Sequence, residues 1–254
     1  MRKSLLISLF GCLVFIPSQN SAFSTNSLDI LLKSTSISER RTAYLDILKD
    51  PDAYVDQILL GIDIWQKTRD QGIEVLNRLI YLAAVLKKDE FIEPLINIAN
   101  DPEYTEHECI YDCPAIFALA VFTTSMHWTP PVQTVDLEIP YLQYLDSLMS
   151  MRRTSLRRTR PGITFSRSED QELLSKTETL SEEELIQQAA PFNKDHMTRW
   201  LAAEVLSYTV TDDKNLLDLY WLAIEEVDDA SCQYRCSIYT AILRAEKAKI
   251  IKGG

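Results

Sequence analysis

Two stretches of this 254-residue chain repeat the same order of features, and this repetition constrains the fold more than any other part of the sequence. A Leu-Ala-Ala segment at 82–84 is followed by Cys109-Ile-Tyr-Asp-Cys113, and a second at 201–203 is followed by Cys232-Gln-Tyr-Arg-Cys236. The offset is 119 residues at the first feature and 123 at the second. The repetition predicts a duplicated helical unit that carries one cysteine pair in each copy.

The spacing of apolar residues predicts helices along most of the chain. Ser36 and Glu39 have the spacing of a capping box, so a helix is expected to begin after Ser36. Asp50-Pro51-Asp52 predicts a turn before a helix over 53–67, and Lys87-Lys88-Asp89 predicts a tight turn between helices at 76–86 and 90–100. Helix pairs joined by short turns must stack on neighbours to bury their apolar faces. The predicted fold is therefore all-α, with stacked antiparallel helix pairs.

The helices around Leu82-Ala-Ala and Leu201-Ala-Ala, paired with neighbours through short turns, resemble HEAT-type α-solenoid repeats. The resemblance covers residues 72–122 and 195–248. It implies an extended, often concave, protein-binding surface and brings no catalytic residues with it. On this interpretation the duplicated unit is interrupted by a long, partly disordered insertion.

Four regions follow from this organisation. They are a secretory signal at 1–24, an N-terminal helical-repeat lobe at 25–124, a linker at 125–192 and a C-terminal helical-repeat lobe at 193–254. Within the linker, Leu180-Ser-Glu-Glu-Glu has the pattern of a capped helix start. The linker also holds the one basic cluster of an acidic chain, made of Arg152, Arg153, Arg157, Arg158 and Arg160. The cluster either folds back on the acidic surface of the protein or docks an anionic partner.

The first residues have the pattern of a signal peptide: basic residues at positions 2 and 3, an apolar run at 5–16, Pro17 and a small-residue site at 22–24. Cleavage near Ser24 would place the mature chain in the periplasm or outside the cell. The apolar run is shorter than the ~20 residues that span a bilayer, and no later segment is longer, so no transmembrane segment is expected. An alternative is a lipobox at Leu9-Phe10-Gly11-Cys12, with Cys12 lipidated.

Removal of Cys12 with the signal would leave four cysteines, an even number that predicts a disulfide framework in an oxidising compartment. In a helix, a Cys-x-x-x-Cys pair has its Cα atoms about 6 Å apart, within reach of a disulfide. Local pairs Cys109–Cys113 and Cys232–Cys236 are therefore favoured. Cross-pairing stays open, and it requires that the equivalent helices of the two copies face each other.

The sequence contains little that points to catalysis. His107-Glu108-Cys109 with Cys113 could hold a soft metal, but the second copy has no histidine. A redox role would favour Cys-x-x-Cys in a βαβ context. Gly-x-Ser-x-Gly, a phosphate-binding glycine loop and His-Glu-x-x-His are absent from the sequence. We expect no enzyme activity and no cofactor, with a thiol-redox protein or a soft-metal carrier as alternatives.

The net charge of the chain indicates which kind of partner it can attract. The chain has a formal charge of −11, and removal of the signal would leave 24 basic against 37 acidic residues. This sign repels nucleic acid phosphates and suits a basic protein. Tyr111 and Tyr234, at the centre of each cysteine motif, either pack in the core or face a partner. The sequence thus predicts an exported protein-binding scaffold, such as an adaptor, an assembly factor or a toxin-immunity protein.

Overall fold

The computed structural model describes residues 26–70, 72–101, 103–104, 113–126, 168–210, 212–225 and 232–253. All regular secondary structure within these ranges is helical, either α-helix or 3-10 helix, and no strand occurs among them. The prediction of an all-helical protein is therefore confirmed for the described residues. In chain order the helices are α1 (Ser27–Lys33), α2 (Ile37–Lys49), η1 (Pro51–Tyr54), α3 (Val55–Thr68), α4 (Ile73–Leu86), η2 (Asp89–Phe91), α5 (Ile92–Ala99), α7 (Pro114–Met126), α9 (Ser168–Thr177), α10 (Glu182–Ala189), α11 (His196–Thr209), α12 (Leu216–Glu225) and α13 (Cys232–Gly253).

Local sequence signals account for the helix starts. The Ser36 hydroxyl accepts a hydrogen bond from the Glu39 N–H at 3.3 Å and caps α2 as predicted. The Glu39 carboxylate, however, accepts the Ser34 hydroxyl at 2.6 Å and does not reach back to Ser36. At α10, Ser181 and Glu184 form the complete reciprocal capping box. The pattern at 180–184 is thus a true helix start.

The predicted turn between α4 and α5 is also present. α4 ends at Leu86, and Lys87 takes a left-handed backbone conformation with φ of 52°. Its N–H donates to the Ala83 carbonyl at 3.0 Å, which satisfies one of the last carbonyls of the helix. The chain then turns directly into η2 at Asp89.

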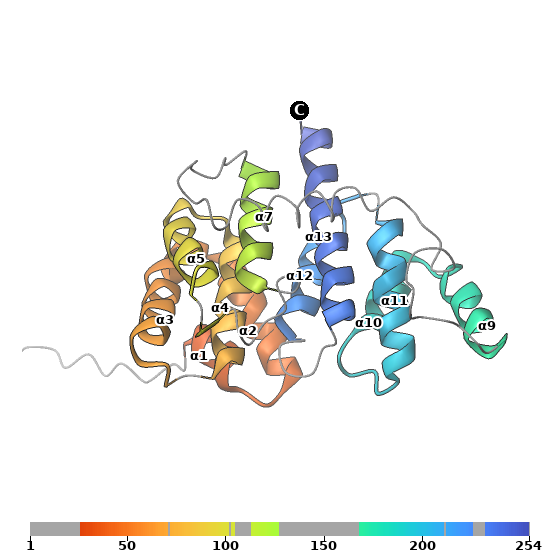
Figure 1. Ribbon diagram of the computed structural model, residues 1–254, viewed down its shortest axis with the longest axis horizontal. Coiled ribbons are helices and arrows are strands. Elements are labelled where there is room, and N and C mark those ends of the chain that lie inside the picture. Colours follow the sequence, from red (N-terminus) through yellow and green to blue (C-terminus); the bar gives the residue numbers. More distant parts are fainter. Residues whose placement is uncertain are drawn as a thin grey trace, which may run out of the picture.

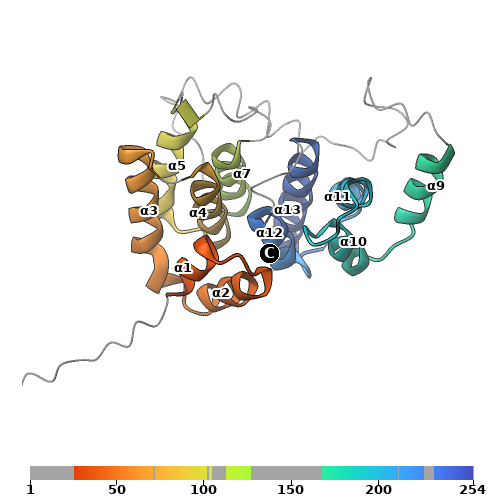
Figure 2. The same cartoon turned by 90° about the horizontal axis from the view of Figure 1, so that it is seen from below.

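Two sets of three helices share one arrangement. In the first set α7 packs against α4 and α5, and in the second α13 packs against α11 and α12. The sets meet where α7 packs on α13 and α12 packs on α4. Figure 1 shows α3 near one end of the long axis and α9 at the other, with α7 and α13 near the middle. Seen from below, α1 and α2 lie along one edge of this row of helices (Figure 2).

A buried group of aromatic rings forms the contact between the two sets. Phe117 of α7 stacks on Tyr239 of α13, with ring centroids 4.1 Å apart and planes 12° from parallel. The hydroxyls of Tyr81 and Tyr239 share a hydrogen bond, and the Tyr220 ring lies 6.5 Å from that of Phe117. All four rings are fully or almost fully buried. They join the N-terminal and C-terminal helices into one core.

The C-terminal packing begins earlier in the chain than residue 193. Helices α9 and α10 lie within the range 125–192, which we interpreted as a linker, and α10 packs against α11. Residues 127–167, including the arginine cluster at 152–160, lie outside the described residues.

No helix in the described part of the chain combines the length and apolar character needed to cross a membrane.

Candidate functional site

The structure describes only some of the residues that the sequence singled out. Cys109, Tyr111 and the arginines lie outside the described ranges, and the side chain of Cys232 is not described. Cys113 is buried immediately before α7, and Cys236 is half-buried in α13. These two described cysteine side chains are not joined to each other. The predicted local pairs each include one cysteine outside the described side chains, so they stay predictions.

The described cysteines of the two motifs differ in their position relative to a helix. Both Cys232 and Cys236 lie within α13, as the helical Cys-x-x-x-Cys geometry requires, whereas Cys113 precedes the first residue of α7. Pro114 explains the difference, since a proline suits the first turn of a helix and disfavours helical backbone in the residue before it. The described cysteine of the first motif therefore lies outside a helix, unlike those of the second motif.

Tyr234 is a packing residue. Its side chain is buried, and its hydroxyl donates to the Ala189 carbonyl at 2.7 Å, which joins α13 to the end of α10. The Arg199 guanidinium lies over the ring, 5.5 Å from its centroid. Burial raises the pKa of Tyr234. Of the two interpretations of this tyrosine, the structure supports packing inside the protein and not display to a partner.

An apolar groove lies between α1, α3 and α4. Its volume is about 370 Å³. Leu60 of α3 lies at its edge with 57% of its surface exposed. The groove is lined by Asn26, Leu28, Asp29, Leu32, Lys33, Gln57, Leu60, Gly61, Ile64, Val75 and Leu79.

Gly61 allows the floor of this groove to form. A Cβ atom at this position would lie 2.8 Å from Cδ1 of Leu79, closer than van der Waals contact permits. Because glycine has no Cβ, the Leu79 side chain packs directly on the backbone of α3. The floor therefore consists of aliphatic carbon from α4 held against α3.

Polar side chains at the rim are bonded to one another. Asn26 donates to the Gln57 side chain and so links α1 to α3, and Lys33 pairs with Asp29 at 2.8 Å along α1. These contacts leave an apolar floor with polar edges. The groove is suited to bury aliphatic side chains, each worth about 1.5–3 kcal/mol when fully removed from water.

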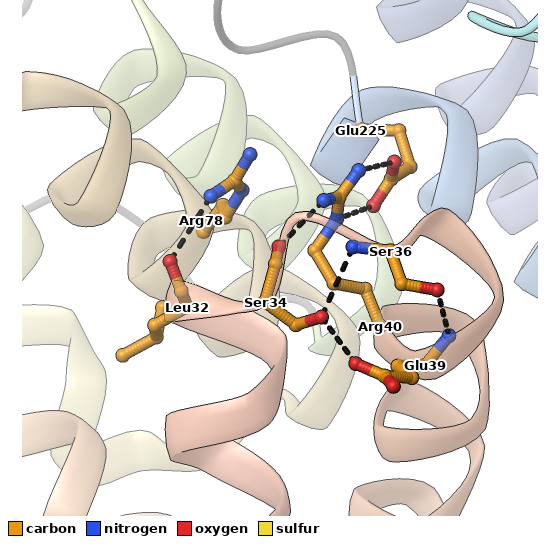
Figure 3. Close-up of polar contacts among 7 residues, drawn as sticks. All are labelled: Leu32, Ser34, Ser36, Glu39, Arg40, Arg78 and Glu225. Atoms are coloured by element: carbon orange, nitrogen blue, oxygen red, sulfur yellow. Dashed lines mark hydrogen bonds and ion pairs between the residues drawn. The ribbon is translucent and has the colours of Figure 1, made fainter.

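Arginines from two neighbouring helices hold α1 in place as one wall of the groove. Nη1 of Arg78 donates to the Leu32 carbonyl at 3.2 Å, and Nη1 of Arg40 donates to the Ser34 carbonyl at 2.7 Å (Figure 3). Both carbonyls lie at the C-terminal end of α1, where backbone acceptors lack helical partners and cations are favoured. A seven-residue helix is too short to be stable alone, so these bonds anchor it.

Arg40 is itself fixed by the C-terminal half of the protein. Its Nε donates to Oε1 of Glu225 at 2.7 Å and its Nη2 donates to Oε2, so the guanidinium is bound at two points (Figure 3). The Glu225 side chain is almost fully buried at the end of α12. The groove wall is thus connected through Arg40 to the opposite half of the chain.

A second buried ion pair lies at the junction of α4, α12 and α13. Glu246 of α13 pairs with Lys87, and Tyr220 donates to the same carboxylate at 2.7 Å. Burial lowers the pKa of Lys87, and the neighbouring Glu246 opposes this effect. Burial also raises the pKa of Tyr220 well above its usual value. The cluster holds the three helices together through a buried ion pair and a hydrogen bond.

The sequence interpretation did not identify the groove. The buried stripe of α3 consists of Val55, Ile58, Ile62 and Trp65, and Leu60 lies outside it. A leucine outside the apolar stripe was the available signal, but a single exposed leucine is common and needs no functional explanation. The groove depends on the positions of α1 and α4 beside α3, which residue spacing does not indicate.

Comparisons of the chain with protein-family models, with curated proteins and with solved structures found no match. The interpretation of the groove therefore depends on its own geometry and chemistry.

Proposed function

We propose that this protein is an exported helical-repeat scaffold that binds another protein, and that the groove between α1, α3 and α4 is its binding surface. The observation that carries the proposal is the exposed Leu60 beside an aliphatic floor. Helix-bordered apolar grooves bind the apolar side chains of partner segments. The binding would act by scaffolding or by steric occlusion, with no chemical step.

Repetition of the three-helix arrangement supports the scaffold part of the proposal. The Leu-Ala-Ala segments of the two predicted copies lie in α4 and α11, and the helices that follow keep the same order and the same packing. HEAT-like stacking of the two copies, export, and a disulfide in each copy complete the proposed scaffold. Stacked repeats of this kind present their binding surfaces on a fixed framework.

A position-specific cross-linking experiment tests the binding surface. A photo-reactive amino acid replaces Leu60 in the full chain, and in a matched variant it replaces Leu45, which is 40% exposed on α2 and does not line the groove. After irradiation in the native host, a discrete cross-linked product is expected from position 60 and not from position 45. The same products from both positions, or none from position 60, would contradict the proposal.

The test needs a check that the variants fold. Exposed side chains tolerate substitution, usually with changes within about 0.5 kcal/mol. Circular dichroism and urea unfolding of the two variants should therefore match the unmodified protein.

A further inference from the structure

We infer that the segment bound in this groove is a basic amphipathic helix, with aliphatic side chains that enter the groove and lysine or arginine beside them. The inference rests on the proposed function, since it assigns the chemistry of the partner at the same groove. The proposed occupant is a segment of another protein and not a second copy of this chain.

Two acidic residues on the helices that border the groove form no ion pair with a basic side chain of the described residues. Asp56 lies one turn before Leu60 on α3 and is exposed, which places it at the border of the groove. Glu74 lies in the first turn of α4, with its carboxylate close to Gly72 and outside the groove lining. Neither belongs to an ion pair of the described residues. A partner that carries positive charge would supply the missing cations.

The lysines nearest the groove do not cancel this charge, because other carboxylates already pair with them. Lys33 of α1 pairs with Asp29 at 2.8 Å, and Lys67 of α3 pairs with Asp63 at 2.7 Å. Arg78, which binds the Leu32 carbonyl at the groove wall, offsets one of the two remaining carboxylates. The local excess is therefore one negative charge, of the same sign as the −11 charge of the whole chain. Complementary charge steers association and selects among partners.

The size and borders of the groove favour a helix as the bound element. A volume of about 370 Å³ is near the lower end for binding pockets, so it accommodates a few side chains and not a folded surface. On an amphipathic helix, residues at i and i+4 lie one above the other and form such a small apolar group. Basic residues that flank this group on the same helix would reach Asp56 at the border of the groove and Glu74 at the N-terminal end of α4.

Synthetic helical peptides test the inference directly. The first peptide carries leucine at i and i+4 with flanking lysines, the second has glutamate in place of lysine, and the third has serine in place of leucine. Fluorescence anisotropy with the full chain should show binding of the first peptide. At low salt the second peptide should bind about tenfold more weakly, as expected for two or more partly exposed charge pairs, and the third should not bind measurably.

Variants of the protein separate the apolar and the charged contributions. Leu60→Asp should abolish binding of the basic peptide, whereas Leu45→Asp, a leucine-to-aspartate change outside the groove, should not affect it. The double variant Asp56→Asn, Glu74→Gln should still bind the basic peptide but lose most of its preference over the acidic one. Added salt should reduce the preference of the unmodified protein in the same way.

Three results would overturn the inference. Equal affinity for the basic and acidic peptides would show that charge does not select the partner. Absence of basic-peptide binding, together with a retained cross-link from position 60, would reject the basic helix but leave the proposed function intact. Self-association that disappears in Leu60→Asp, measured by sedimentation, would identify a second copy as the occupant.

Discussion

Arg40 and Glu225 form a buried ion pair with two hydrogen bonds, although 185 residues separate them in the sequence. The pair joins α2 to the end of α12. The same guanidinium donates to the carbonyl of Ser34, the residue that follows the last residue of α1. One arginine thus connects the groove wall to the C-terminal half. Buried pairs of this kind contribute to the specificity of packing, and the loss of one partner leaves an uncompensated charge.

Removal of the Glu225 carboxylate should therefore destabilise the protein. We expect Glu225→Ala to lower the free energy of unfolding by about 3–5 kcal/mol, since Arg40 would keep its charge in a buried site. Urea unfolding followed by circular dichroism measures the change. Lys49→Ala is a suitable control, because the exposed Lys49–Asp46 pair should contribute only about 0–1 kcal/mol. Similar losses in the two variants would contradict the structural role of Arg40 and Glu225.

The aromatic contact between the two helix sets should be equally important. Phe117→Ala removes a fully buried ring that stacks on Tyr239, and it should destabilise the protein by about 3–5 kcal/mol through lost burial and a residual cavity. Phe192 is 63% exposed, so Phe192→Ala should change stability by less than about 0.5 kcal/mol. Thermal unfolding compares the two. A small effect at Phe117 would show that α7 and α13 do not pack as described.

Buried tyrosines should make the protein sensitive to alkali. Burial raises the pKa values of Tyr44, Tyr220 and Tyr234 above their usual value of 10.0. The unfolded chain loses these protons near pH 10 while the native state keeps them, so the native state binds more protons and stability falls as pH rises. The fall should approach about 1.4 kcal/mol per pH unit for each tyrosine.

The free energy of unfolding should be measured above pH 10.5. The lowered pKa of Lys87 acts in the opposite sense below that value, where the unfolded chain still binds its proton. Denaturant unfolding between pH 10.5 and 11.5 avoids the opposing effect of Lys87, although Lys88, Lys214 and Lys252, whose pKa values are raised by hydrogen bonds to carboxylates, add to the fall. Comparison with Tyr234→Phe, which should reduce the slope by about 1.4 kcal/mol per pH unit, separates the contribution of the tyrosine. A free energy of unfolding that does not change over this range would be incompatible with the burial of these hydroxyls.

The proposed disulfides can be tested by mass spectrometry of protein isolated from its native compartment. Alkylation without reductant should label none of Cys109, Cys113, Cys232 and Cys236, and reduction should make all four reactive. Replacement of Cys232 and Cys236 by alanine should lower stability by about 2 kcal/mol, as expected for a short cross-linked loop. If this variant keeps its stability but loses the biological activity of the protein, a redox function for the thiols would be favoured instead.

Much of the secondary structure follows from the sequence alone, because its signals are local. Ser36 and Ser181 begin helices through bonds to residues three positions later, and the turn at Lys87 ends α4 through a bond to Ala83. Such contacts need no distant partner, so residue spacing predicts them. The order of the two cysteine motifs likewise indicated corresponding helices in the two halves.

The burial of individual side chains, the long-range ion pairs and the groove depend on tertiary packing. Whether Tyr234 faces a partner or the core depends on the position of α10, and the pairing of Arg40 with Glu225 depends on how α12 lies against α2. The groove exists only because three helices that are not all consecutive in the chain meet beside Gly61. Helical periodicity states which side of a helix is apolar, but burial and charge pairing are properties of the space between helices, and these depend on contacts between residues far apart in the chain.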